Sequence, residues 1–410
     1  TSDRIANAEA GGIAGSLGLA ATVLLPSADV AGTVRAYAGE GADINAASLS
    51  VRADGVQLRA LAESFAVGFS GLTTVNILQS DADVTGEVAA FIGAGAGNAS
   101  TASAPIVVVT GGVVVDADAL MAANAVANSV AASLLGLAVS AVRPTAEVSG
   151  RTLAYVRDRV DMTAGSLQVR AGTIADRVVY QAETRTFVAG LSLGSAGNFV
   201  QADAKISGLV DSFIGAPFGI APAADATRSL DISGVVDVDA WSGMDATATI
   251  DTIGVSGGLT VGAMLTTTDI SAITRAAVNQ GARINAQGLT VDANGRYDSR
   301  SNTESVNVGG LAAFALADAE AKVSGTVDAH VGAHATTSPS ATLAVVNVGS
   351  GTVDVNAVGD MQAIPDIDSD TVSFGVALSG LRLRAIVTGI VRGYVGEGVE
   401  IDAGALNVNA

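Results

Sequence analysis

Two histidines are the first candidates for chemistry, because the imidazole nitrogens of histidine are common metal ligands. They are His330 and His334, the only histidines in the chain. Their spacing matches the two histidines of a helical metalloprotease motif, but the glutamate of that motif is missing. On a β-strand the same spacing puts both side chains on one face. The sequence therefore predicts a surface or turn position for both histidines, with a weak metal site as the alternative.

A second candidate is the run of alternating carboxylates at Asp366, Asp368 and Asp370. Calcium prefers oxygen ligands, and this alternation resembles the start of a calcium loop. The glycine and the bidentate glutamate of such a loop are absent at the right distances, and Pro365 precedes the run. The sequence predicts at most a calcium site at these three aspartates, with a solvated turn as the alternative. No other cofactor is expected.

The residue types give little support to catalysis. Carboxylate pairs such as Asp81/Asp83 could serve a glycosidase or a lyase, but such an enzyme needs one unique cleft and this sequence is repetitive. Trp241 and Tyr297 could stack on a sugar, although each stands alone. Without cysteine there is neither a disulfide framework nor a thiolate metal site. We predict that the chain is not an enzyme and has no catalytic residue.

Composition narrows the class of protein further. The chain has 410 residues, a net charge of −19 and 49 glycines; 49% of its residues are hydrophobic but only 4% are aromatic. The core must therefore be thin and built from small side chains. Nucleic acid and anionic membranes are poor partners for so acidic a chain. Because the negative charge is spread along the sequence, it should keep a long assembly soluble.

One uncharged stretch, residues 119–142, is long enough to cross a bilayer. Asn124, Asn128 and several serines interrupt it, and matching positions of other repeats carry charges such as Glu63 and Asp251. We therefore expect no membrane insertion.

Internal repetition is the decisive feature of this sequence. A Leu/Val-x-Val-x-Ala ending occurs seven times, with its central valine at Val51, Val115, Val169, Val238, Val291, Val355 and Val408. Short and long units alternate, so that pairs of units span about 118 residues. We predict one continuous array over residues 1–410 with seven units: 1–53, 54–117, 118–171, 172–240, 241–293, 294–357 and 358–410.

A second motif, Ala-x-Val-x-Gly-x-Val, precedes each ending. Its central position is alanine in one unit, Ala272, and glycine in the other six: Gly32, Gly86, Gly150, Gly208, Gly325 and Gly389. If equivalent strands stack about 4.8 Å apart, these residues form one ladder along the array. Glycine there would allow a close approach that a Cβ would block.

The motifs alternate apolar and polar residues with period two, which is typical of strands. We predict roughly three strands per unit and little or no helix. The fold class is therefore all-β, a repetitive β-solenoid of the right-handed parallel β-helix type with a thin Ala/Val/Gly core. Tandem antiparallel β-sandwich repeats are the alternative, which we rank second because no hairpin signal recurs at a fixed phase.

Every second unit is longer by 10 or 11 residues between its second motif and its ending. Four of the seven prolines lie in these inserts, Pro105, Pro217, Pro222 and Pro339. Proline suits a loop or an edge better than the middle of a sheet. We expect the inserts to project from one side of the array.

The Ala-rich, Val-x-Gly strands that end in Gly-Leu-Thr-Val-x-Ala, as at residues 288–293, resemble a known family. They are similar to the repetitive passenger regions of very large bacterial surface adhesins, of the filamentous-haemagglutinin-like and leukotoxin-type filamentous kinds. The resemblance implies export, a β-solenoid stalk, and a location on the bacterial cell surface or outside the cell. It supplies no functional residue.

Three functions remain open at this point. The first is a structural stalk or adhesin segment of a giant exported protein, used in cell adhesion or a biofilm matrix and cut from a longer array. The second is a self-assembling extracellular filament or matrix subunit, and the third is a carbohydrate-active β-helix enzyme. Expected partners are neighbouring repeats of the same chain, other copies of it and surface glycans.

Overall fold

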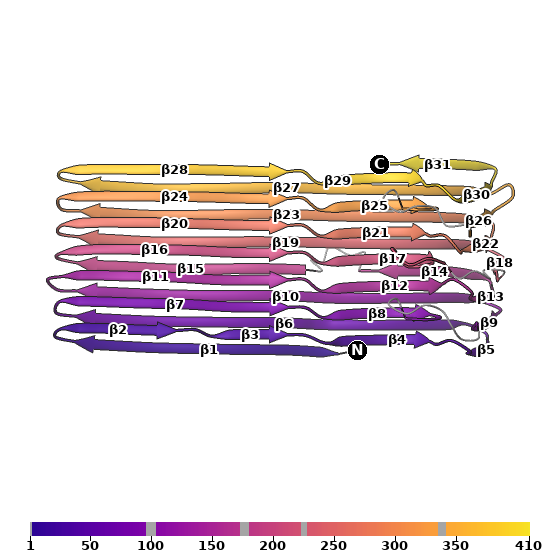
Figure 1. Cartoon of the computed structure of the whole chain (residues 1–410), viewed down its shortest axis with the longest axis horizontal. Helices are drawn as coiled ribbons and strands as arrows, with labels where there is room; N and C mark the ends of the chain where they lie inside the picture. Colours follow the sequence, from indigo (N-terminus) through magenta and orange to yellow (C-terminus); the bar gives the residue numbers. More distant parts are fainter. Residues whose placement is uncertain (1, 96–103, 173–179, 223–227, 335–341) are drawn as a thin grey trace.

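The computed structural model describes residues 2–95, 104–172, 180–222, 228–334 and 342–410. Within these ranges the chain forms strands and no helix, and every strand pairing is parallel. The strands stack coil upon coil from the N-terminus to the C-terminus (Figure 1). The prediction of an all-β solenoid is confirmed. The antiparallel sandwich alternative is wrong, because equivalent segments of successive units run side by side in the same direction.

Each coil passes through four parallel sheets, here called A, B, C and D, and each sheet receives one segment per coil. The number of strands per coil is thus larger than the three expected. The long sheet A contains β1 (Asp3–Ser16), β6 (Leu49–Ser70), β10 (Gly112–Ser133), β14 (Ser166–Ala171), β15 (Tyr180–Ser192), β19 (Val235–Ser256), β23 (Gly288–Gly309), β27 (Thr352–Ser373) and β31 (Ala405–Asn409).

Sheet B returns along sheet A after a tight turn. Its strands are β2 (Leu19–Leu24), β3 (Ser27–Val30), β7 (Thr73–Val84), β11 (Leu137–Val148), β16 (Ser195–Ile206), β20 (Leu259–Ile270), β24 (Ala312–Val323) and β28 (Val376–Val387).

Sheets C and D complete each coil. Sheet C contains β4 (Thr33–Ala38), β8 (Glu87–Ile92), β12 (Arg151–Arg157), β17 (Leu209–Gly215), β21 (Ile273–Val278), β25 (Thr326–Val331) and β29 (Ile390–Val395). Sheet D contains β5 (Asp43–Ala46), β9 (Ile106–Val109), β13 (Asp161–Ala164), β18 (Leu230–Ile232), β22 (Arg283–Asn285), β26 (Ala344–Asn347) and β30 (Val399–Asp402). We number the coils 1 to 7 by their sheet C strands, from β4 to β29.

The glycine ladder predicted from the second motif is present at the bend between sheets B and C. The backbone N–H of Glu87 donates to Gly32 O at 2.8 Å, and that of Arg151 donates to Gly86 O at 2.9 Å. The same bond links every later rung, including the one where Ala272 replaces glycine. Gly86 therefore lies directly beside Gly32, as the shared register predicted. The ends of the sequence units, such as Ala53, fall inside long strands of sheet A.

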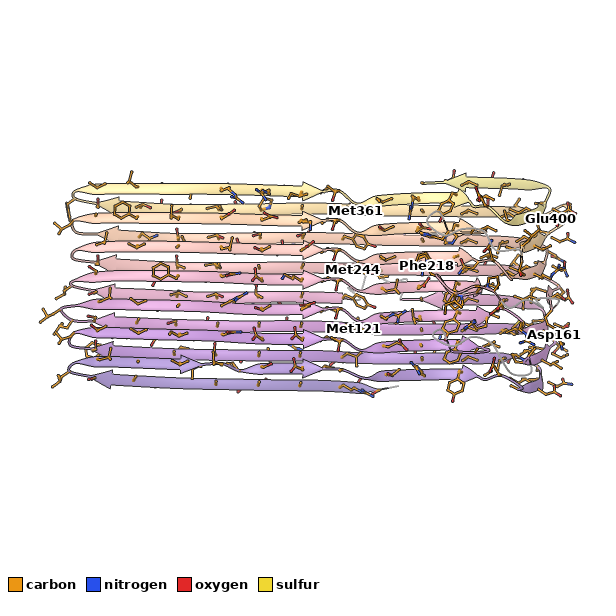
Figure 2. The ribbon with its side chains drawn as sticks, viewed as in Figure 1. Met121, Asp161, Phe218, Met244, Met361 and Glu400 are labelled. Carbon is orange, nitrogen blue, oxygen red and sulfur yellow. The ribbon has the colours of Figure 1, made fainter. Side chains whose placement is uncertain are left out.

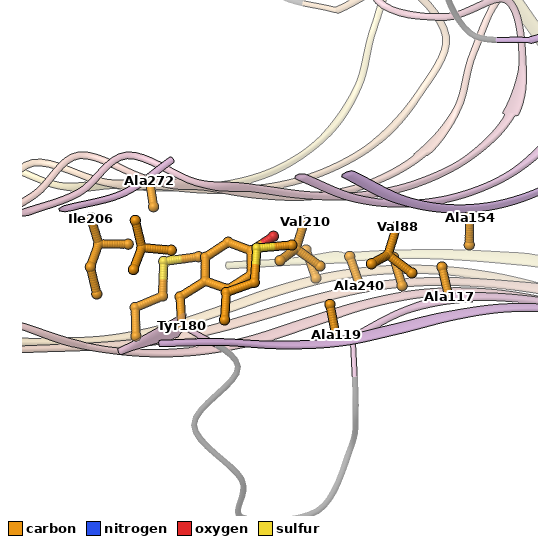
Figure 3. Close-up of a cluster of buried hydrophobic side chains, with 14 of the residues drawn as sticks. Val88, Ala117, Ala119, Ala154, Tyr180, Ile206, Val210, Ala240 and Ala272 are labelled. Carbon is orange, nitrogen blue, oxygen red and sulfur yellow. The ribbon is translucent and has the colours of Figure 1, made fainter. Parts of the chain in front are cut away.

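The core is one continuous cluster of buried alanine and valine between sheet A and the facing sheets. Residues such as Ala123, Ala182 and Ala246 occupy equivalent positions of successive sheet A strands and are fully buried. Figure 3 shows the two layers with small side chains between them and the ring of Tyr180 as a large exception. A thin core of this kind follows from the composition.

The glycine ladder makes room for a side chain rather than for a second backbone. Across the core lies one column of large sheet A residues, of which Met121, Met244 and Met361 are labelled in Figure 2. A Cβ at Gly86 would come within 2.6 Å of Leu58 Cδ1, and one at Gly208 would overlap the ring of Tyr180. Ala272 is tolerated in coil 5, where the facing residue is the flexible Met244.

The inserts of coils 2, 4 and 6 all connect sheet C to sheet D, after β8, β17 and β25. They therefore occur at one edge of the stack, as their phase in the repeat predicted. Pro105, Pro217 and Pro222 lie in the described parts of the inserts, whereas Pro339 lies outside the described residues. Pro144 and Pro365 stand inside β11 and β27, where the period-two pattern alone does not single them out.

Residues 119–142 form parts of β10 and β11 rather than a helix. Across the described ranges, the search for a helix long and apolar enough to span a bilayer finds none.

Replacing Gly208 by alanine should lower the free energy of unfolding by ~1–3 kcal/mol, because the new methyl group overlaps the rigid Tyr180 ring. Denaturant unfolding measures the loss. Gly11→Ala is the control, since a Cβ there has no atom within 4 Å.

Adding Tyr180→Met to the Gly208→Ala chain reproduces the Ala272–Met244 pairing of coil 5. Most of the lost stability should return. A Gly208→Ala chain as stable as the parent would contradict the assignment of this ladder to side-chain clearance.

Candidate functional site

His330 lies in β25 on the outer face of sheet C, but it is only 1% exposed. Its Nδ1 is 2.7 Å from Asp328 Oδ1, and its Nε2 is 3.1 Å from Asn279 Oδ1. His334 follows the strand, and its Nε2 is 3.4 Å from Asp328 Oδ2. The structure brings the two histidines together on one carboxylate, so the expectation of a surface position was wrong for His330. In the part of the chain that is described, no group of three or more such side chains has an arrangement that could hold a metal ion.

Asp328 belongs to a ladder of alternating charges along sheet C. The third residues of β17, β21, β25 and β29 are Asp211, Arg275, Asp328 and Arg392. Arg275 forms two hydrogen bonds to the Asp211 carboxylate, the one from Nε at 3.0 Å. Arg392 Nη2 is 2.7 Å from Asp328 Oδ2. Because neighbouring rungs carry opposite charges, the ladder neutralises itself in a buried place.

Burial and these neighbours shift the ionisation of the ladder. Burial alone would raise the pKa of Asp328, but hydrogen bonds from His330 and His334 and the charge of Arg392 hold it well below its usual range. Burial would lower the pKa of Arg275, but the Asp211 carboxylate raises it instead. Burial lowers the pKa of His330, and the Asp328 carboxylate beside it acts in the opposite direction.

An aromatic ladder lies beside the charges, at the fifth residue of the sheet C strands. Tyr37, Phe91, Tyr155 and Phe213 stack with ring centroids 4.8–5.0 Å apart and nearly parallel planes. Ala277 interrupts the column in coil 5, and His330 resumes it against Tyr394 at 5.1 Å. Since each ring covers the next, the faces of the inner rings are not available to a ligand.

The described part of the coil 4 insert packs on this side of sheet C. The ring of Phe218, from the coil 4 insert, lies 4.6 Å from Arg275 Cζ and packs edge-on against His334 at 4.7 Å (labelled in Figure 2). Asn279 Nδ2 donates to Ala216 O at 2.8 Å. Tyr37, in the first coil, is 62% exposed, whereas Tyr155, whose ring lies between those of Phe91 and Phe213, is 1% exposed. The described parts of the inserts thus pack on the scaffold, contrary to the expectation that they project. We call the outer side of sheet C the capped face.

A cavity of ≈ 430 Å³ remains at the capped face. Glu87 lies in it between two arginines, with Oε1 2.8 Å from Arg35 Nη2 and Oε2 3.6 Å from Arg151 Nη1. Phe218 and the edges of the aromatic ladder complete its wall. This cavity is the place where exposed charge and aromatic surface meet, so it could accept a small polar or anionic group.

The other sequence candidates lie elsewhere. Tyr297 is fully buried in the core, where its hydroxyl donates to Thr326 O at 3.1 Å and lies 2.8 Å from Thr274 Oγ1. It cannot stack on a sugar, so that interpretation was wrong. Trp241 is half-buried against the core.

Asp366, Asp368 and Asp370 lie inside β27 on the outer face of sheet A, not in a turn. Alternate strand residues are ~7 Å apart, so the three carboxylates form an exposed row rather than a closed cage. Their sheet neighbours are Asn302, Glu304 and Val306. The calcium site at these residues stays a prediction.

The sequence pattern alone did not single out the residues of the capped face, because each of these positions is typical of a solvent-exposed strand residue. A signal was nevertheless present three residues after the ladder glycine. Counted from Gly208, Ala272, Gly325 and Gly389, that position holds residues of alternating charge. Two residues further on, Tyr37, Phe91, Tyr155 and Phe213 recur. Comparing columns across repeats would have predicted both ladders.

Comparisons with known proteins identify no relative: no family model, curated protein or solved structure matches this chain.

Replacing Arg275 by methionine should destabilise the fold by ~3–5 kcal/mol, because Asp211 is then buried without its partner. The side chains of Arg275 and Asp211 are 8% and 5% exposed, so solvent cannot take over the role of the arginine. The midpoint of urea unfolding measures the effect.

The double variant Asp211→Leu/Arg275→Met removes both charges and should recover most of that loss. If Arg275→Met alone left the midpoint unchanged, the charge ladder would have no part in holding the capped face together.

Proposed function

We propose that this chain is a structural stalk segment of a very large exported bacterial surface protein, used in adhesion or in a biofilm matrix. The observation that carries the proposal is the continuous stack: equivalent strands pair through all seven coils along one main core, with a register shift between β6 and β10 at Ala119/Met121. Such a stack gains length by adding coils without changing its cross-section. The resemblance of the repeats to filamentous adhesin passengers supports the same function.

A structural role also fits the polar groups of the capped face. Asp211, Arg275, Asp328 and Arg392 pair along the ladder, and His330 is engaged on both ring nitrogens. A catalytic acid or base needs access to its substrate, whereas these groups are held by one another beneath the inserts. We therefore favour a non-enzymatic role; saturable turnover of a polysaccharide, lost on mutation of one carboxylate pair, would overturn this choice.

Surface glycans are the ligands that we propose for the cavity beside Glu87. Arg35 and Arg151 offer hydrogen-bond donors at its rim, and Phe218 offers an apolar surface. Acidic sugars would suit these donors better than neutral ones, because the guanidinium group binds carboxylates in a bidentate geometry.

The shape of the chain determines how many copies a long stalk would need. Figure 1 shows that its longest dimension runs along the strands, across the stacking direction. Seven coils at ~4.8 Å advance the stack by only ~34 Å. A stalk that reaches far from a cell surface therefore requires many such segments in series.

A tandem chain, with Thr1 of a second copy following Ala410 directly, tests the stacking. This junction keeps the register, because Arg4 of the second copy falls at the level of Met361 of the first. Electron microscopy should show one particle that is ~34 Å longer along the stacking direction and has the same cross-section. Two separate particles joined by a flexible connection would contradict a continuous stalk.

A further inference from the structure

The outer face of sheet B near the turn from sheet A has the polarity expected of an interior. In β7, Asn76 is fully buried while the next residue, Ile77, is 43% exposed. In β16, Asn198 is 1% exposed and Phe199 is 48% exposed. The buried asparagines place the apolar residues of these strands outside, against water. A large exposed apolar area of this kind marks a site of interaction.

We define the apolar B face as the outward side chains at the first, third and fifth positions of seven sheet B strands. These are β2, β7, β11, β16, β20, β24 and β28. None of these outward side chains carries a charge, although the chain as a whole has 40 acidic residues. The charged outward positions of sheet B begin only at the seventh residue of each strand. The negative charge that should keep copies of this chain apart is therefore absent from this face.

Side-chain size alternates along the fifth row from one coil to the next. Coils 2, 4 and 6 carry large residues and coils 3, 5 and 7 carry small ones: Ile77, Phe199 and Leu316 against Ala141, Ala263 and Gly380. The small residues open a groove of ≈ 690 Å³ along the stack, lined by both sets. Knobs and holes thus repeat every second coil, ~10 Å apart.

A second copy of the same chain carries the matching pattern. A two-fold axis parallel to the strands, passing between coils 4 and 5, places each coil opposite a coil of the other parity. Ile77 of one copy then faces Gly380 of the other, Leu316 faces Ala141, and Phe199 faces Ala263. In this fifth row each large residue meets a small one, so the row is self-complementary about the two-fold axis.

The charged rows beside the apolar B face are complementary under the same operation. Asp81 faces Arg384, Glu147 faces Lys322, and Lys205 faces Asp269. Arg143 likewise faces Asp318. The acidic end of the face is poorly compensated in the single chain: burial and the charges of Glu147, Asp29 and Asp81 raise the pKa of Asp83 to about 6. Arg384, at the other end, belongs to coil 7 and would reach this cluster in the pair.

The area is sufficient for a stable pair. Sheet B of coils 2 to 7 covers ~29 by ~40 Å, or roughly 1,200 Å² per copy, of which the apolar B face supplies ~29 by ~17 Å and the charged rows the rest. A typical stable interface buries ~800 Å² per partner. A lipid bilayer is a poorer occupant, because the apolar B face has no Lys, Arg, Trp or Tyr to meet headgroups.

We propose that the chain self-associates as an antiparallel pair, with the apolar B face of one copy docked on the apolar B face of a second, coil 2 against coil 7. The pairing turns a single solenoid into a two-layered one and extends beyond the stalk function. Because the two stacks run in opposite directions, it would join stalks that project toward each other, such as those of two facing cells.

Thiol cross-linking tests the register. The chain has no cysteine, so Ile77→Cys/Gly380→Cys introduces the only two thiols. Packed sheets lie ~10 Å apart, too far for a direct disulfide but within reach of a bis-maleimide of about that length. Within one copy the two thiols are five coils, ~24 Å, apart, which is beyond that reach. The reagent should give a covalent dimer in high yield. The matched control Ile77→Cys/Ile364→Cys, which moves one thiol to the outer face of sheet A, should give little.

Exchange of a knob and a hole tests the packing. Ala263→Phe fills a hole opposite Phe199 of the second copy, and the dimer seen by analytical ultracentrifugation should weaken at least tenfold. Phe199→Ala/Ala263→Phe moves the knob by one coil and should restore the dimer. Both positions face outward, so the thermal unfolding of each variant reports separately that the fold is intact.

A chain that stays monomeric at concentrations of about 100 µM would overturn the proposal. So would cross-linking with equal yield in the control, or a dimer that Ala263→Phe leaves unchanged. Binding of the chain to neutral or anionic vesicles with loss of the dimer would assign the apolar B face to a membrane instead.

Discussion

The thickness of the core governs this fold, because two sheets must face each other at one spacing through every coil. Where sheet A carries a large residue such as Tyr180 or Tyr297, the facing bend must be glycine. Where it carries Met244, alanine suffices. The composition rich in glycine and alanine is the consequence of this constraint. Since the constraint acts at every coil, it also keeps the register: a shift by one residue would move each large side chain away from its glycine.

Stacking at ~4.8 Å imposes a second rule, because each side chain is the near neighbour of its counterpart in the next coil. Aromatic rings satisfy the rule by stacking, as Phe91 does on Tyr155. Charges satisfy it by alternating, as Asp211, Arg275 and Asp328 do. The acidic row around Asp83 breaks the rule, and its raised pKa records the cost. The same neighbour relation therefore explains both the stable ladders and the poorly compensated acidic row.

The outer faces of sheets B and C, which meet at the bend, differ in how they are covered. The described part of the coil 4 insert packs against the aromatic and charged rows of sheet C, where Tyr155 and Phe213 are buried outside the main core. No insert emerges over sheet B, since all three connect sheet C to sheet D. Its apolar rows remain open, with their knobs and holes in the two-coil rhythm that the inserts also follow. This shared period links the covering of one face to the shape of the other.

The sequence by itself determined the all-β class, the repeat and the glycine ladder, because period-two alternation and a recurring glycine are local signals. It also determined that the inserts share one edge, since phase in a regular stack fixes position. It did not reveal that Asp211 and Arg275 touch, or that His330 is buried. Those residues lie 64 and 51 positions from their partners, and only the coil register brings them together. The sequence also left open which face of a strand points inward. From the sequence alone, Asn76 would be expected to face solvent and Ile77 to face the core. Tertiary packing made that choice, and with it the apolar B face.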